Sequence, residues 1–185
     1  MPPIPSPILH IALGSNRRHG RHGAPQAVIA AATTALTTAG LTVIAQSRVQ
    51  ATAPLGPRQR RFANAVVAVK SILPLPEVLA LLQSIERDFG RRRGRRWGPR
   101  VLDLDLVAAG TAVTPRRGWR PTVRGRLRAD GPSLIVPHRG IAYRRFVLDP
   151  LVEIAGGWRH PVLHLTARQL HARLCRPKRF DAGSP

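Results

Sequence analysis

Residues 62–107 read FANAVVAVKSILPLPEVLALLQSIERDFGRRRGRRWGPRVLDLDLV, and this stretch decides the fold class. It opens with a short run rich in valine and alanine at 62–69 and closes with a second apolar run at 101–107, and both have the length of a strand. Between them, Pro76 suits the first turn of a helix, and apolar residues recur at helical spacing until Gly90, which suits its end. The stretch therefore predicts a strand, a helix and a second strand.

The preceding part of the chain predicts the same alternation. Residues 8–13 form an apolar strand that ends at Gly14, a helical pattern runs from Pro25 to Gly40, and alternating side chains at 41–49 predict another strand. The full order is strand, helix, strand, strand, helix, strand. This order predicts an α+β, ferredoxin-like sandwich with an antiparallel sheet and its helices packed on one face.

The last third of the chain predicts smaller elements within the same single domain, which we expect to span residues 8–176. A short strand is expected at 134–138, a partly helical segment at 141–154 and a short helix at 166–174. We expect residues 1–7, which are rich in proline, to be disordered and residues 177–185 to form a flexible tail.

A long connection at about 110–132 contains six arginines and one acidic residue. Connections of this length are uncommon in compact domains, so we expect it to be either functional or a mobile insertion. Because the stretch has few apolar residues to bury, we also expect that deletion of residues 114–130 leaves the fold intact.

The composition leaves several functions open. Thirty lysine and arginine residues face nine acidic ones, for a net charge of +21. Such a balance is typical of nucleic-acid binding, of a site for a polyanion such as ATP, or of a GC-rich genome that favours arginine codons. The chain has one cysteine, Cys175, and no apolar run long enough to cross a bilayer. We therefore expect a cytoplasmic protein with no membrane partner.

Two of the few carboxylates, Asp103 and Asp105, lie two residues apart on a predicted strand. Side chains alternate along a strand, so both carboxylates point to one face, about 6–7 Å apart, while Leu104 and its neighbours point into the core. Magnesium binds in proteins through one or two carboxylates together with substrate phosphates and water. The pair predicts a magnesium site next to a nucleotide, with an ordinary solvated sheet face as the alternative.

The segment just before this strand is strongly basic. Residues 91–100 contain six arginines, whose planar guanidinium groups match phosphate oxygens, and Trp97, whose ring can stack on a base or seal a closed loop. Taken alone, the segment also fits a solvated loop or a nucleic-acid patch. Its position beside two carboxylates favours a nucleotide triphosphate site.

Other candidates carry weaker signals. Phe62 and Asn64 share a face of a predicted strand, where a ring and a carboxamide can stack a heterocycle and bind its edge, although a core Phe beside a solvent-facing Asn is the simpler interpretation. Gln83 and Glu86 are neighbours on a predicted helix, where Glu86 is expected at the surface. His138 is a candidate phosphate or ribose contact, or a structural hydrogen-bonding residue.

Taken together, these motifs resemble the 6-hydroxymethyl-7,8-dihydropterin pyrophosphokinase family of folate biosynthesis. The segments that carry the resemblance are IALGSN (11–16), TAPLG (52–56), FANAVV (62–67), IERDFGR (85–91), RWGPRVLDLDL (96–106), VPH (136–138) and RRFVLDPLVEIA (144–155). Their order and spacing match almost end to end, and RWGPR-x-x-DLD is the most specific of them.

The resemblance implies a ferredoxin-like enzyme that transfers the pyrophosphoryl group of ATP to the hydroxymethyl group of the dihydropterin and releases AMP. It implies two Mg2+ ions held by Asp103 and Asp105, with ATP as co-substrate. The catalytic residues it implies are Arg91, Arg93, Trp97, Arg100, Asp103 and Asp105. The residues around ATP would be Gln83, Glu86, Leu106, His138 and Arg144. The residues around the pterin would be Thr52, Pro54, Leu55, Phe62, Asn64 and Phe146.

The alternative from a different class is a nucleic-acid-binding protein on the same fold. Ferredoxin-like sheets bind RNA through exposed aromatic rings. This chain has only four Phe and one Tyr, and the exposed sheet face would carry two carboxylates that repel phosphate. We therefore expect a monomeric enzyme whose partners are its small-molecule substrates.

Overall fold

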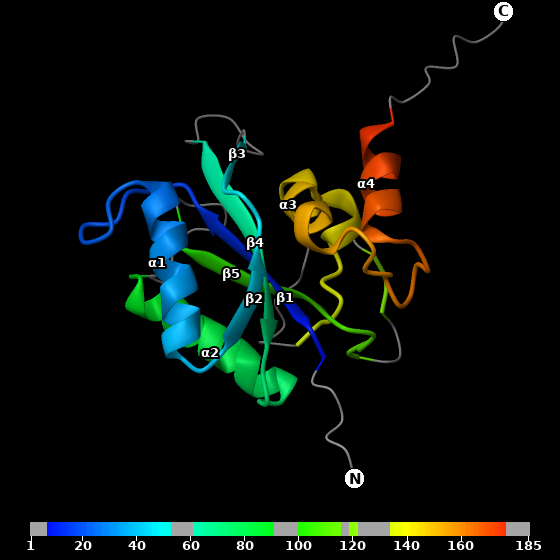
Figure 1. Ribbon diagram of the computed structural model, residues 1–185, viewed down its shortest axis with the longest axis horizontal. Helices are drawn as coiled ribbons and strands as arrows, with labels where there is room; N and C mark the ends of the chain where they lie inside the picture. Colours follow the sequence, from blue (N-terminus) through cyan, green and yellow to red (C-terminus); the bar gives the residue numbers. More distant parts are fainter. Residues whose placement is uncertain (1–6, 53–60, 91–99, 116–118, 122–133, 177–185) are drawn as a thin grey trace, which may run out of the picture.

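The structure is a computed structural model that describes residues 7–52, 61–90, 100–115, 119–121 and 134–176 (Figure 1). The described elements are β1 (Leu9–Ser15), α1 (Pro25–Thr38), β2 (Thr42–Gln46), β3 (Gln50–Thr52), β4 (Phe62–Lys70), α2 (Leu75–Asp88), β5 (Asp103–Ala109), a 3-10 turn (Ile141–Tyr143), α3 (Arg145–Ala155) and α4 (Ala167–Cys175). Residues 1–6 of the expected N-terminal segment 1–7, all of the expected tail 177–185 and most of the connection at 110–132 lie outside the described residues.

The strands form one antiparallel sheet in the order β2-β4-β1-β5, with β3 paired to β4. β1 lies between β4 and β5, so the strand that carries the aspartate pair is at an edge of the described sheet. The predicted order of strands and helices is confirmed, and with it the ferredoxin-like α+β fold.

Helices cover both faces of this sheet (Figure 1). α1 and α2 form the predicted layer, and their buried residues join Leu9, Ile11 and Leu13 of β1 in the main core. α3 and α4 form a second layer on the opposite face, where a smaller core contains Val66 of β4 and Val107 of β5. The C-terminal helices were expected from the sequence, but their position on the second face was not.

Two predicted strands are shorter in the structure. Of the run at 41–49, only Thr42–Gln46 forms a strand, β2, whose pairing with β4 contains a register shift between Val43 and Ala45, and the short β3 begins after the run, at Gln50. At 134–138 the structure has only an isolated bridge between Val136 and Thr114. Pro137 has no N–H to donate to a ladder, so the pairing stops there.

A cluster of four rings fills the second layer at the end of the sheet that lies away from the aspartates. This histidine–tryptophan cluster consists of His10, Trp119, Trp158 and His160, with neighbouring ring centroids 4.9 to 6.2 Å apart. Trp119 belongs to the long connection and is only 8% exposed. The expectation that residues 114–130 have little to bury is therefore wrong at Trp119.

No helix among the described ranges has the length and apolar character needed to cross a membrane.

Acidification is expected to destabilise the fold through His10. Burial lowers the pKa of His10 from 6.5 to about 4, so its ring stays neutral in the fold but takes up a proton in the unfolded chain below pH 6.5. The full stability is therefore present above pH 6.5 and is lost as the pH falls toward 4, by at most about 3 kcal/mol for this group. Urea unfolding at a series of pH values measures the loss. His10→Phe, which cannot titrate, should give a shallower pH dependence, and an unchanged slope would contradict this assignment.

Candidate active site

The two aspartates lie side by side on β5 with their side chains directed to the face that α3 covers. Asp103 is opposite Gly14 and Asp105 is opposite Ala12 in β1, and Ala12 packs against the core of the second layer. Leu104, between them, is buried in the main core on the other face. The side chains of Asp103 and Asp105 are 27% and 38% exposed, so solvent reaches both carboxylates.

An arginine pairs with each aspartate. Arg100 donates from Nη1 to Oδ1 of Asp103, and Nη1 of Arg144 lies 3.6 Å from Oδ2 of Asp105. Burial disfavours the charged form of Arg100, but the negative charges of Asp103, Asp105 and Glu86 outweigh it and raise its pKa above the ordinary value. The site therefore places two carboxylates beside two guanidinium groups. The carboxylates suit cations and the guanidinium groups suit phosphates, so the site fits a ligand that contains both.

Asn16, at the end of β1, fixes the backbone of Arg100. Its Oδ1 accepts the N–H of Arg100 at 2.8 Å, and its own N–H donates to the carbonyl of Arg100 at 3.1 Å. Asn16 is only 3% exposed. This reciprocal pair joins the start of β5 to the end of β1, although the two residues are 84 positions apart.

The other end of the basic segment is also held by the loop after β1. His22 stacks on Phe89, the last residue before Gly90, with ring centroids 5.0 Å apart. The basic segment at 91–99, with the predicted Arg91, Arg93 and Trp97, lies outside the described residues. Its two described flanks are thus both in contact with the loop that follows β1.

Glu86 is a buried carboxylate behind the aspartate strand. Although a surface position was expected, the residue is only 2% exposed, and its Oε1 accepts the N–H of Leu104 at 2.8 Å. Leu104 lies between Asp103 and Asp105 on the edge strand, where this N–H has no strand on that side in the described sheet. Glu86 therefore fixes the backbone between the two aspartates.

A second group of side chains lies at the same end of the sheet, on β3, β4 and α3. Asn64 of β4 is buried, and its Nδ2 donates to Oγ1 of Thr52 on β3 at 2.6 Å. A Cβ on Gly14 would lie 3.3 Å from Oδ1 of Asn64 and 3.9 Å from Cβ of Asp103, so glycine lets these two side chains approach from either side. Phe62 is half-buried and shares the face of Asn64.

Phe146 lies in the first turn of α3, and the guanidinium carbon of Arg144 is 5.7 Å from the centre of its ring. Because α3 packs across β4, Phe146 and Phe62 belong to elements that face each other. The predicted pterin contacts Pro54 and Leu55 lie outside the described residues.

His138 connects to the aspartates through the backbone of β5. Its N–H donates to the carbonyl of Val107 at 2.9 Å, and its Nδ1 accepts the N–H of Gly140 at 3.0 Å. Burial lowers the pKa of His138, the negative charge of Asp105 opposes that shift, and the positive charge of Arg144 adds to it. The pKa of His138 therefore depends on the charges of both Asp105 and Arg144.

The structure thus brings together most of the described residues that the sequence singled out. Gln83 is half-buried on α2, and Leu106 is buried in the main core on the face opposite Asp105.

Two residues that contribute to the structure around the site, Asn16 and Trp119, had no predicted role. The available signals were that Asn16 is the last residue of the segment IALGSN (11–16) and that Trp119 is the only aromatic residue of the connection.

The donor set fits magnesium better than a metal that needs several protein ligands. Within the described ranges no three His, Cys, Asp or Glu side chains gather around one point. Two partly exposed carboxylates on one face are nevertheless sufficient for Mg2+, which completes its coordination with phosphate oxygens and water.

Comparison with known proteins gives consistent matches. The family model described as 7,8-dihydro-6-hydroxymethylpterin-pyrophosphokinase (HPPK) matches residues 10–156. A relative from Methylorubrum extorquens, named 2-amino-4-hydroxy-6-hydroxymethyldihydropteridine pyrophosphokinase, is 38% identical over 149 residues, which cover 79% of this chain and 81% of the relative. A relative of the same name from Synechocystis is 38% identical over 115 residues, or 62% of this chain, and this chain spans about half of its length (51%).

Among solved structures, wild-type HPPK-DHPS from Plasmodium falciparum superposes with a TM-score of 0.64 at 14% identity. The match covers 91% of this chain and 44% of the Plasmodium chain. At this identity the likeness supports the fold alone.

Proposed function

The chain belongs to the 7,8-dihydro-6-hydroxymethylpterin-pyrophosphokinase family, and from this premise we propose that it transfers the pyrophosphoryl group of ATP to 6-hydroxymethyl-7,8-dihydropterin. In this reaction the substrate hydroxyl oxygen forms a bond to the β-phosphorus and gives up its proton, the bond from that phosphorus to the α-phosphate oxygen breaks, and AMP leaves. The observation that carries the proposal is the aspartate pair on β5, flanked by Arg100 and Arg144.

The proposed magnesium site consists of Asp103 and Asp105, and two ions are proposed there. Bound Mg2+ neutralises the charge that develops on the phosphate oxygens. By binding these ions, the two carboxylates would hold the triphosphate close to β5. Arg100 and Arg144 supply further positive charge, and with ATP bound we propose that they exchange their aspartate partners for phosphate oxygens.

The proposed pterin site is the group around Asn64. Its carboxamide is fixed by Thr52, which suits it to bind the edge of a flat heterocycle, and Phe62 and Phe146 offer rings on facing elements. Holding the pterin between two rings places its hydroxyl for attack. Such positioning lowers the barrier by several kcal/mol in well-oriented reactions, of order 7–11 kcal/mol at most.

We also propose the remaining roles implied by family membership. Gln83, Glu86 and His138 are proposed to lie around ATP, as is Leu106 through its backbone, since its side chain is in the main core. Arg91, Arg93 and Trp97 are proposed to close over the phosphates. A cytoplasmic, monomeric enzyme is proposed, since one cysteine suits a reducing compartment.

The proposal is tested by mixing the purified protein with ATP, Mg2+ and 6-hydroxymethyl-7,8-dihydropterin and following AMP. We expect AMP to form only when all three are present, in equal amount to the pyrophosphorylated pterin. Formation of AMP that does not depend on the pterin, or of ADP in its place, would contradict the proposed transfer.

Asn64→Ala is expected to raise the KM for the pterin about tenfold or more, because it removes the carboxamide that would pair with the heterocycle. The KM for ATP should change little, since the nucleotide is proposed to lie on the other side of Gly14. Gln46→Ala, on the exposed part of β2, is the control for loss of a strand carboxamide. An equal rise in both KM values for Asn64→Ala would count against a specific pterin contact.

A further inference from the structure

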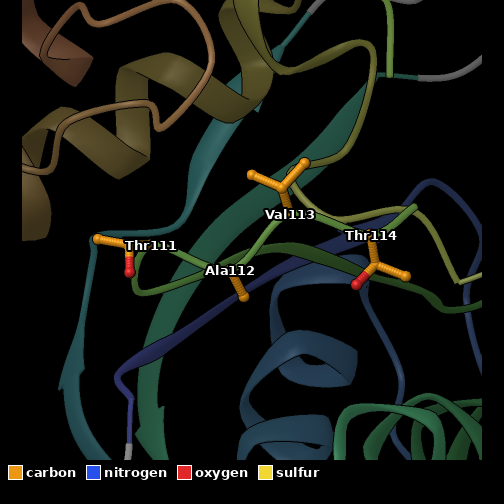
Figure 2. Close-up of a pocket in the computed structure, with 4 residues that line it drawn as sticks. All are labelled: Thr111, Ala112, Val113 and Thr114. Atoms are coloured by element: carbon orange, nitrogen blue, oxygen red, sulfur yellow. The ribbon is translucent and has the colours of Figure 1, made fainter. Parts of the chain in front are cut away.

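The long connection after β5 is attached to the site at two described points. It leaves the sheet through Thr111–Thr114, which line a pocket of about 510 Å3, with Val113 pointing away from Ala112 (Figure 2). Thr114 then exchanges two backbone hydrogen bonds with Val136, at 2.7 and 2.9 Å. The start of the connection is therefore paired with the residue two positions before His138.

Trp119 forms the second attachment. Its indole Nε1–H donates to the carbonyl oxygen of Pro137 at 2.7 Å, and the residue is buried. The ring packs edge-on against His160, with the centroids 4.9 Å apart, and His160 is itself 0% exposed. An aromatic residue from an arginine-rich connection thus occupies a fixed place in the histidine–tryptophan cluster.

The hydrogen bond from Trp119 completes the constraint on one peptide unit. The Pro137–His138 peptide receives the indole N–H on its carbonyl and donates its own N–H to Val107 of β5. Both polar ends of this peptide are therefore occupied, one by the connection and one by the strand that carries Asp105. The position of the His138 backbone relative to β5 is set between these two contacts.

The constraint continues into the charged part of the site. A Cβ on Gly140 would lie 2.8 Å from Nε of Arg144 and 3.1 Å from Cε1 of His138, so both side chains close tightly over this glycine. Arg144 in turn pairs with Asp105. A shift of the His138 backbone would be transmitted to the arginine that faces the aspartate pair.

We propose that Trp119 is a positioning residue that holds His138 and Arg144 at the nucleotide side of the site. This inference rests on the proposed function. It assigns to the connection a role in nucleotide binding through the hydrogen bond from Trp119 to the carbonyl of Pro137.

The chain contains a matched control. Trp158 lies in the same cluster, and its Nε1–H also donates to a backbone carbonyl, that of Gly110 at 2.9 Å. Trp119→Phe and Trp158→Phe therefore remove the same chemical group from the same cluster, but only Trp119 contacts the peptide of His138.

The test compares steady-state kinetics and urea unfolding of the two variants with the wild-type chain. We expect Trp119→Phe to raise the KM for ATP about fivefold to tenfold, the range for loss of one hydrogen bond, with kcat changed less than about twofold. In a double variant with His138→Ala, the two effects on KM should be less than additive. Trp158→Phe should lose similar stability and keep the wild-type KM.

A wild-type KM for folded Trp119→Phe, or the same rise in KM for Trp158→Phe, would overturn the inference. A wild-type chain without pterin-dependent AMP formation would overturn the proposed function instead, so the two failures are distinct. Should Trp119→Phe not fold, the indole N–H resonances of the wild-type chain provide the second measurement, assigned with Trp158→Phe and Trp97→Phe. Saturating Mg2+ and ATP should shift the Trp119 signal and leave that of Trp158, and an unmoved Trp119 signal contradicts the role.

Discussion

Asp105→Asn is expected to lower kcat at least about a hundredfold while the chain stays folded. The substitution keeps the size and shape of the side chain but removes the negative charge that we propose binds Mg2+. Removal of one group that stabilises developing charge in a reaction typically costs about 100- to 1000-fold in rate. Asp103→Asn should have an effect of the same order, because both carboxylates share one face of β5.

The matched control is Asp149→Asn on α3. Asp149 also lies near an arginine, with its Oδ1 3.7 Å from Nε of Arg145, and it contacts His171 of α4. It therefore tests the general effect of removing a partly exposed, paired carboxylate. AMP release at saturating substrates is the measurement. A rate for Asp105→Asn close to that of Asp149→Asn would contradict the role of the pair.

Glu86→Ala is expected to lower both stability and activity. It leaves the buried N–H of Leu104 without its acceptor, which costs about 1–3 kcal/mol of unfolding free energy. It also frees the backbone between Asp103 and Asp105, and a displacement of about 1 Å in a reacting group can cost a hundredfold in rate. We therefore expect at least a tenfold loss of kcat, measured beside urea unfolding.

Two further variants separate the possible causes. Glu86→Gln retains an oxygen that can accept the N–H of Leu104, so it should keep most of the stability. Glu86→Gln still removes a negative charge that contributes to the raised pKa of Arg100, so it should lower the pKa of Arg100. Glu77→Ala, at the exposed start of the same helix, is the control for the loss of a helical glutamate. If Glu86→Ala is as stable and active as Glu77→Ala, the proposed support of β5 is wrong.

The sequence predicted those features that depend on local periodicity. Alternation along β5 placed Asp103 and Asp105 on one face and the leucines on the other, and the structure has this arrangement. The helical spacing of apolar residues in α1 and α2 likewise predicted the layer that they form. These signals are strong because each residue lies in a regular element whose period fixes its direction.

The features that the sequence did not predict depend on contacts between distant segments. Asn16 and Arg100 meet because β1 and β5 are neighbours in the sheet, and nothing in either local pattern specifies their two hydrogen bonds. Glu86 was expected at the surface because a single carboxylate on a helix usually is. It lies four residues after the buried Leu82, on the face that packs under β5, and this position was the available sign of its burial.

The position of the second layer, formed by α3 and α4, also could not be predicted from local sequence patterns. The helical character of α3 and α4 was predictable, but the face of the sheet that they cover is determined by tertiary packing around Val66 and Val107. The burial of Trp119 depends on this layer too, because its partner His160 follows α3. Only the complete fold therefore reveals that the connection reaches the site.

The central claim, that the two aspartates of β5 bind divalent cations together with the nucleotide, is tested most directly by anomalous scattering. Crystals of the full chain would be grown with Mn2+ in place of Mg2+, a non-hydrolysable ATP analogue and the pterin. We expect anomalous peaks within roughly 2.0–2.3 Å of carboxylate oxygens of both Asp103 and Asp105, with phosphate oxygens completing the coordination. Bound nucleotide with Arg100 and Arg144 still on the aspartates, and manganese elsewhere or absent, would contradict the account.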